Sequence, residues 1–252
     1  MKGTLIVFAC LSVIAAYAQE EDAVQAEAQS ESAAAAPVAE PQELSETGIV
    51  MSILEKNGVT GVSFSDIATF GEGRIVGLNL NNPEAGRPGI KILPPEIGRL
   101  DALKILSLND NDLVTLPDEI GRLKALERLE ARNNSLVALP STIGNLSNLE
   151  ELDVRNNELT SLPIEIGLCS KLWKLQLWGN ALRTLPESIG GLSSLRELYL
   201  RGNRLTTMPR SVLKLKLGYL DMQENRLCDV SSEIDLWLKK FDAKYRSWQK
   251  CW

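Results

Sequence analysis

The sequence predicts an α/β solenoid, in which a stack of short repeats lines up its strands as one parallel β-sheet. An eleven-residue pattern, L-x-x-L-x-L-x-x-N-x-L, recurs six times between Leu103 and Leu227. Its asparagines follow one another at steps of 23 residues, and the last step is 22. Each repeat also carries a proline and an Ile-Gly or similar pair at fixed positions. Self-similarity at this period is typical of units that bury their apolar face only against their neighbours.

Each repeat begins with a short strand. In Leu152-Asp153-Val154, apolar and polar residues alternate, as expected for a strand with one buried face. Because the pattern keeps its register from repeat to repeat, we expect the strands to stack side by side.

A buried asparagine ladder is predicted where each strand ends. An asparagine side chain has one acceptor and two donor hydrogens, so it can pair backbone groups that no strand reaches. Leaving such a group unpaired costs about 1–3 kcal/mol. The predicted members are Asn111, Asn134, Asn157, Asn180, Asn203 and Asn225.

The return path of each repeat is equally regular. A proline, which donates no backbone hydrogen bond and suits a turn, follows an apolar residue at Pro117, Pro140, Pro163, Pro186 and Pro209. Ile-Gly pairs begin at Ile97, Ile120, Ile143, Ile166 and Ile189.

These motifs closely resemble the typical leucine-rich repeat in its 23-residue form, L-P-x-x-I-G-x-L-x-x-L-x-x-L-x-L-x-x-N-x-L, over residues 75–227. The resemblance implies a curved horseshoe with a concave parallel β-sheet. It also implies a face used mostly to bind other proteins rather than to catalyse a reaction.

The composition restricts the chemistry available to the 252-residue chain, which contains no histidine. His-dependent general bases and His-ligated metals are therefore excluded, and we predict neither a cofactor nor a metal. Eight acids and no base lie in residues 19–46, so most of the formal charge of −6 resides there. The nearly neutral remainder lacks the basic face that nucleic-acid binding requires.

The first 18 residues are typical of a secretory signal peptide. Lys2 precedes an apolar run that is too short to span a membrane, and the small residues around Ala18 predict cleavage after it. A lipid anchor at Cys10 is the alternative, which bulky Phe8 disfavours. We therefore expect a secreted, periplasmic or cell-surface protein without a membrane span.

Residues 19–46 are rich in Ala, Glu, Gln, Ser and Pro, which predicts a disordered acidic tether. It would serve either as a spacer or as a solvating tail without a partner.

An N-terminal cap is predicted over residues 47–74. Ser45 can cap a helix whose apolar face carries Ile49, Val50, Ile53 and Leu54, and Gly58 can end it. A membrane-surface helix is the alternative, but the basic face is missing. An irregular first repeat follows, with a strand at Ile75 and Leu78 and an insertion within residues 82–89.

Residues 228–252 resemble the C-terminal caps of exported bacterial leucine-rich repeat proteins. By this resemblance we expect a disulfide between Cys228 and Cys251. The alternative, Cys169 with Cys228, would join residues more than two repeats apart, too far for a disulfide at a strand spacing of about 4.8 Å. Cys169 occupies a leucine position and is predicted to be a core residue.

Outward strand residues would form the ligand-binding concave face. Aromatic residues and arginine are common at interface hot spots, so Trp178, flanked by Arg155 and Arg201, is its predicted centre. Alternatively, the face is a self-contained ladder in which Arg155 stacks on Trp178 and Arg132 pairs with Asp153. The predicted ligand-binding residues are Glu130, Arg132, Asp153, Arg155, Lys174, Trp178, Tyr199 and Arg201.

An enzyme is not expected. Glu130, Glu151 and Asp153 crowd together as paired carboxylates do in glycosidases, but their arginine neighbours should keep them ionised. A flat face also lacks a pocket. We predict a monomeric, exported scaffold that binds a protein or a surface glycan. The alternative is a structural envelope protein without a discrete ligand.

Overall fold

The computed structural model describes residues 44–82 and 88–251. The predicted signal peptide, the lipidation alternative at Cys10 and most of the predicted tether lie outside this part of the chain. So do five residues of the predicted insertion, 83–87. The chain divides into residues 1–43 and a compact unit, Leu44–Trp252, and only the second is described below.

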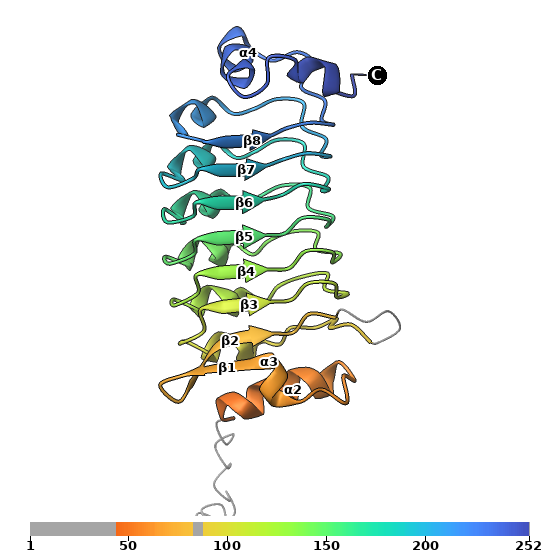
Figure 1. The fold of residues 1–252 in the computed structure, drawn as a ribbon, viewed down its shortest axis with the longest axis vertical. Coiled ribbons are helices and arrows are strands. Elements are labelled where there is room, and N and C mark those ends of the chain that lie inside the picture. Colours follow the sequence, from red (N-terminus) through yellow and green to blue (C-terminus); the bar gives the residue numbers. More distant parts are fainter. Residues whose placement is uncertain (1–43, 83–87, 252) are drawn as a thin grey trace, which may run out of the picture. The chain divides into compact units, whose positions relative to one another are not determined.

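The unit begins with helices α2 (Glu46–Lys56) and α3 (Phe64–Ile67) and with strands β1 (Ala68–Gly71) and β2 (Arg74–Asn79). Each repeat then adds one three-residue strand and one 3₁₀ helix, stacked along a common axis (Figure 1). The strands are β3 (Ile105–Ser107), β4 (Arg128–Glu130), β5 (Glu151–Asp153), β6 (Lys174–Gln176), β7 (Glu197–Tyr199) and β8 (Tyr219–Asp221). The 3₁₀ helices are η1 (Pro95–Arg99), η2 (Asp118–Arg122), η3 (Ser141–Asn145), η4 (Ile164–Leu168), η5 (Glu187–Gly191) and η6 (Arg210–Lys214). Helices α4 (Ser232–Lys239) and η7 (Tyr245–Trp248) end the unit.

The eight strands form one sheet in chain order, and β2 to β8 pair in parallel without a shift of register. Leu129, Leu152 and Leu175 are therefore direct partners and point to the same side. The N-terminus adds one strand to the predicted parallel sheet, because β1 pairs antiparallel with β2. Glu72 and Gly73 join these strands with φ angles of 52° and 78°, the geometry of a two-residue hairpin.

A single apolar core runs from Ile49 in α2 to Tyr245 in η7. The inward leucines of the strands are fully buried, and so is Cys169 at its leucine position. Burial raises the pKa of the Cys169 thiol to about 11, so the thiol stays protonated and unreactive at neutral pH.

The Ile-Gly pairs allow successive 3₁₀ helices to approach closely. Each of these helices starts after a proline, whose carbonyl accepts the first hydrogen bond, as Pro140 does from Ile143 at 3.1 Å. A Cβ atom on Gly144 would lie 2.5 Å from the carbonyl oxygen of Glu165 in the next repeat. No side chain fits there, so the tight packing between repeats requires glycine.

The asparagines behind the strands form a continuous ladder of hydrogen bonds. Asn157 donates to the carbonyls of Ala131 (2.9 Å) and Val154 (3.0 Å) and accepts from the amide of Leu136 (2.9 Å). The same bonds recur at the other members of the ladder, for example at Asn203 and Asn225. Each rung thereby ties one repeat to the preceding one.

Each end of the stack is closed by a polar side chain. At the N-terminus, Ser45 caps α2, and the side-chain oxygen of Asn57 accepts from the amides of Lys91 (2.8 Å) and Ile92 (3.0 Å). At the C-terminus, buried Gln249 takes the place of a further asparagine. It accepts from the amide of Leu227 (3.1 Å) and donates to the carbonyl of Met222 (3.2 Å).

A disulfide between Cys228 and Cys251 holds the C-terminal cap, with Cα atoms 5.9 Å apart. Asp235 in α4 adds polar contacts to the cap, because it accepts from Tyr245 Oη at 2.6 Å and from Arg246 Nε at 3.0 Å. Hydrogen bonds from Lys239, Tyr245 and Arg246 lower the pKa of Asp235.

Replacing Asn157 with alanine should lower the free energy of unfolding by about 1–3 kcal/mol. Among the described residues, the buried amide of Leu136 has no acceptor other than the Asn157 side chain. The matched control is Asn156→Gly, which removes the neighbouring, more exposed amide at a φ of 52° that glycine tolerates. It should cost less than about 1 kcal/mol. Urea unfolding followed by circular dichroism measures both values, and equal losses would contradict a structural role specific to the buried ladder.

Removing the disulfide by Cys228→Ser/Cys251→Ser should reduce stability by about 3 kcal/mol, because the bond closes a loop with a sequence separation of 23. The loss should start in the cap, so limited proteolysis should cut after Cys228 before it cuts the repeats. An unchanged unfolding midpoint would mean that Gln249 and Asp235 hold the cap without the covalent bond.

Candidate ligand-binding face

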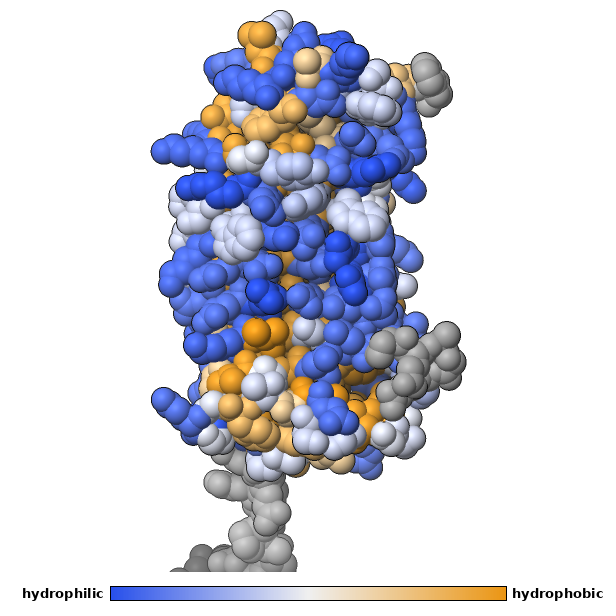
Figure 2. Space-filling view, viewed as in Figure 1, coloured by the Kyte–Doolittle hydropathy of each residue, from blue (hydrophilic) through white to orange (hydrophobic). Residues whose placement is uncertain are grey.

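The concave face consists of the outward side chains of β3–β8 and of the residues two positions after each strand. Strand register places Glu130 beside Asp153 and Gln176 beside Tyr199 in its central column. Lys174 pairs with Glu197 in the flanking column. Hydrophilic side chains dominate the visible surface over β4–β7, whereas apolar ones gather over β1–β3 (Figure 2).

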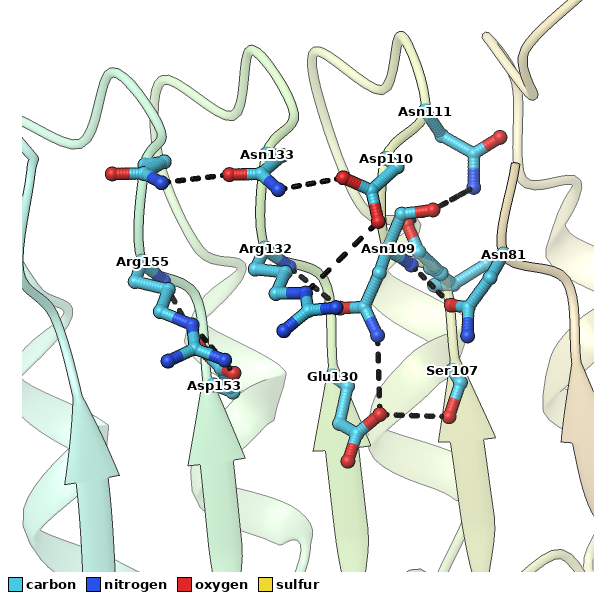
Figure 3. Close-up of polar contacts among 12 residues, drawn as sticks. Asn81, Ser107, Asn109, Asp110, Asn111, Glu130, Arg132, Asn133, Asp153 and Arg155 are labelled. Atoms are coloured by element: carbon cyan, nitrogen blue, oxygen red, sulfur yellow. Dashed lines mark hydrogen bonds and ion pairs between the residues drawn. The ribbon is translucent and has the colours of Figure 1, made fainter. Parts of the chain in front are cut away.

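A polar network covers the N-terminal half of this face (Figure 3). Glu130 Oε2 accepts from Ser107 Oγ at 3.0 Å and from Asn109 Nδ2 at 3.1 Å. Arg132 Nε lies 4.0 Å from Asp110 Oδ2, and its backbone amide donates to Asn109 Oδ1 at 3.0 Å. Most of these groups bond to one another, but Arg132 Nε is buried and forms no hydrogen bond with the described residues.

The expected pairing of Arg132 with Asp153 was wrong. Asp153 instead pairs with Arg155, two residues later in the sequence (Figure 3). Arg155 Nε lies 3.1 Å from Asp153 Oδ2. The Arg155 guanidinium therefore pairs with Asp153, and the Arg132 guanidinium pairs with Asp110. Glu151 pairs across strands with Arg128 at 2.7 Å.

The expectation that arginine neighbours would prevent a rise in carboxyl pKa was also wrong for Asp153. This side chain is buried, and burial raises its pKa although Arg155 opposes the shift. Its charged neighbours are Arg155, Arg132 and Glu130, all on the same sheet.

A second, surface ladder follows the turn after each strand. Asp110, Asn133 and Asn156 all adopt positive φ, and their side chains bond in series: Asn133 donates to Asp110 at 2.6 Å and Asn156 donates to Asn133 at 2.7 Å. In the next two repeats this position is glycine, at Gly179 and Gly202, with φ of 70° and 67°.

Aromatic rings distinguish the C-terminal half of the face. The Arg155 guanidinium lies 5.6 Å from the centre of the Trp178 ring, which confirms that stacking contact. The Lys174 ammonium lies 5.9 Å from the Tyr199 ring and 3.6 Å from Glu197. The rings of Tyr199 and Tyr219 are 5.0 Å apart. Three successive repeats thus bring Trp178, Tyr199 and Tyr219 to this half of the face, here called the aromatic cluster, and cations contact two of its rings.

The polar groups around this cluster are held in fixed states. Tyr199 Oη donates to Glu197 at 3.0 Å, and burial together with this bond raises the pKa of Tyr199 to about 12. Arg201 donates to Glu224 through Nε at 2.8 Å and through Nη2 at 2.5 Å. Hydrogen bonds from Arg201 and Lys250 lower the pKa of Glu224, so this acid stays ionised.

The prediction from the sequence that this face would be flat was wrong. A hollow of about 500 Å³ opens beside the aromatic cluster. Its lining residues are Trp178, Gly179, Tyr199, Arg201, Gly202, Asp221 and Glu224. Of the eight predicted site residues, Trp178, Tyr199 and Arg201 therefore meet at one place. Glu130, Arg132, Asp153, Arg155 and Lys174 instead bond or stack within the sheet.

Sequence reasoning missed Gly179, Gly202, Asp221 and Glu224 as members of this site. A signal for the glycines was present, because aligned repeats place Asp or Asn at their position. Among the described residues, no group of three acidic or cysteine side chains is arranged to hold a metal ion. No helix in the same residues is long and apolar enough to cross a membrane.

Comparisons with known proteins agree on the fold. Residues 74–176 match the family Leucine-rich repeat region, and residues 170–227 match the family Leucine rich repeat. A search of curated proteins finds no match.

Solved structures resemble the chain over part of its length. A leucine-rich repeat protein of Leptospira interrogans is 38% identical over 63% of this chain and 45% of its own, with a TM-score of 0.48. A plant ice-binding protein is 25% identical over 71% of this chain and 62% of its own, with a TM-score of 0.63.

The ectodomain of the receptor kinase GASSHO1/SCHENGEN3 from Arabidopsis thaliana was solved in complex with Casparian strip integrity factor 2. It is 30% identical over 66% of this chain and 20% of its own, with a TM-score of 0.54. The chain spans less than two thirds of the length of each of these structures. The two family matches, which together cover residues 74–227, show that the chain belongs to the leucine-rich repeat proteins.

Proposed function

We propose that this protein is an exported, non-enzymatic scaffold that recognises a protein partner through the C-terminal half of its concave face. The observation that carries the proposal is the convergence of Trp178, Tyr199 and Arg201 on one hollow. Tryptophan, tyrosine and arginine dominate interface hot spots, which lie in pockets surrounded by contacts that exclude water.

The internal pairing of charges supports recognition by shape and apolar contact. On the concave face, Arg128, Lys174 and Arg201 each have an acidic partner within the sheet or its turns. Such exposed pairs contribute little binding energy of their own. They orient the aromatic rings and leave the hollow as the feature that a partner can fill.

Export is supported by the disulfide of the C-terminal cap, because such bonds persist in oxidising compartments. Use of the fold for recognition is supported by the Arabidopsis ectodomain, whose structure contains a bound factor. The signal-peptide pattern of residues 1–18 agrees with both.

The variant Trp178→Ala/Tyr199→Ala/Arg201→Ala should abolish partner capture while the repeats stay folded, because the ladder and the core do not include these side chains. Crosslinking and pull-down from the envelope and medium of the exporting cell, with identification of captured proteins by mass spectrometry, supplies the measurement. With a partner in hand, Kd should rise at least about thirtyfold, which corresponds to roughly 2 kcal/mol at a hot spot.

The matched control is Arg183→Ala/Arg204→Ala/Arg226→Ala, which removes three exposed side chains outside the concave face. It should capture the partner as well as the unaltered chain does. Equal capture by both triple variants would place recognition outside the concave face. Capture by none of the three proteins would favour a structural role in the envelope.

A further inference from the structure

The hollow beside Trp178 exists because two consecutive repeats lack a side chain at the turn position that carries the surface ladder. Asp110, Asn133 and Asn156 occupy this position in the preceding repeats, and Glu224 occupies it in the last. A Cβ atom at Gly179 would collide with the Asn156 side-chain oxygen. At Gly202, by contrast, the nearest atom to such a Cβ is 3.6 Å away, so a side chain fits there. The glycine at 202 is therefore not required by packing.

The walls of the hollow favour a neutral, apolar occupant. Trp178 and Tyr199 line it, and each ring already contacts a cation of the protein itself, Arg155 and Lys174. A cation from a ligand would meet the like charges of Arg155, Lys174 and Arg201 as well as the opposite charges of Asp221 and Glu224, so its charge gains little there. Apolar contact with the ring surfaces does not depend on charge.

The rim offers one donor group and one acceptor group. Arg201 binds Glu224 through Nε and Nη2, which leaves its Nη1 hydrogens for a ligand. Glu224 is occupied on both oxygens by Arg201 and Lys250. Within residues 44–82 and 88–251, the Asp221 carboxylate accepts one hydrogen bond, from the Gln223 amide at 3.3 Å. A donor and an acceptor match the C=O and N–H of a peptide backbone, whereas a sugar ring would present several hydroxyl groups.

Building on the proposed function, we infer that this hollow is an anchor subsite that receives one large neutral side chain, such as phenylalanine or leucine, from an extended segment of the protein partner. Trp178, Tyr199 and the two glycines contact the side chain. Arg201 and Asp221 bond to the backbone that carries it. Specificity then depends on the absence of a side chain at positions 179 and 202.

The decisive variant is Gly202→Asn, which restores the residue type found at positions 133 and 156. Asparagine tolerates positive φ, so the fold should persist, and its side chain should occupy the hollow. Asn133→Gly is the matched control, because it removes a side chain at the same turn position outside the hollow. Thermal unfolding should show all three proteins folded.

N-acetyl-phenylalaninamide is the probe, and N-acetyl-lysinamide and methyl β-glucoside are compared with it. Each is titrated into the whole chain while the indole N–H signal of Trp178, assigned with Trp178→Phe, is followed by NMR. We expect a saturable shift with the phenylalanine probe alone, unchanged in Asn133→Gly and reduced at least about fivefold in Gly202→Asn. A saturable shift with the glucoside or the lysine probe instead, or an undiminished response in Gly202→Asn, would overturn the inference.

Partner capture separates this inference from the proposed function. If Gly202→Asn captures the partner as well as the unaltered chain while Trp178→Ala/Tyr199→Ala/Arg201→Ala does not, the face is a binding site but the hollow is not its anchor. If neither variant loses capture, the proposed function fails as well. Loss in both, with Asn133→Gly unaffected, supports both statements.

Discussion

The structure depends on one requirement, that backbone groups buried where each strand ends must find hydrogen-bond partners. A side chain with both donors and an acceptor, placed once in each 23-residue repeat, meets this requirement for its own repeat and for the preceding one. This explains why Asn157 and its counterparts other than the half-buried Asn134 are buried although they are polar. Strands β3 to β8 can then remain three residues long. The hydrogen bonds of the sheet pair some backbone groups, and the asparagine side chains pair the others. The outward side chains then carry little of this duty, although Asn109 still accepts from the backbone amide of Arg132.

Much of this architecture follows from the sequence because a repeated pattern reports the same physical environment many times. The periodic leucines predict the core, and the register of the strands follows from their spacing. The ends of the stack are different, because each occurs once and no repetition marks it. The β1–β2 hairpin and the role of Gln249 as a final rung were therefore not predictable from the pattern.

The candidate site was predictable only in part for a similar reason. Position alone places Trp178 and Tyr199 on the concave face, but the choice of partners among several nearby charges depends on side-chain geometry. Asp153 bonds to Arg155 in its own repeat rather than across the strands to Arg132. The hollow depends on side chains that are absent, and an absence is visible in a sequence only when the repeats are compared column by column.

The sequence separation of 23 in the Cys228–Cys251 disulfide equals one repeat, and Gln249 binds the last repeat as an asparagine would. The C-terminal cap thus keeps the spacing of the stack that it closes, although it contains an α-helix in place of a strand. Whole modules could consequently be inserted or deleted between the caps without redesigning either end. Such changes would move the aromatic cluster relative to the N-terminal hairpin in steps of one strand spacing, about 4.8 Å. The distance between the aromatic cluster and the N-terminal hairpin can therefore be set by the number of repeats.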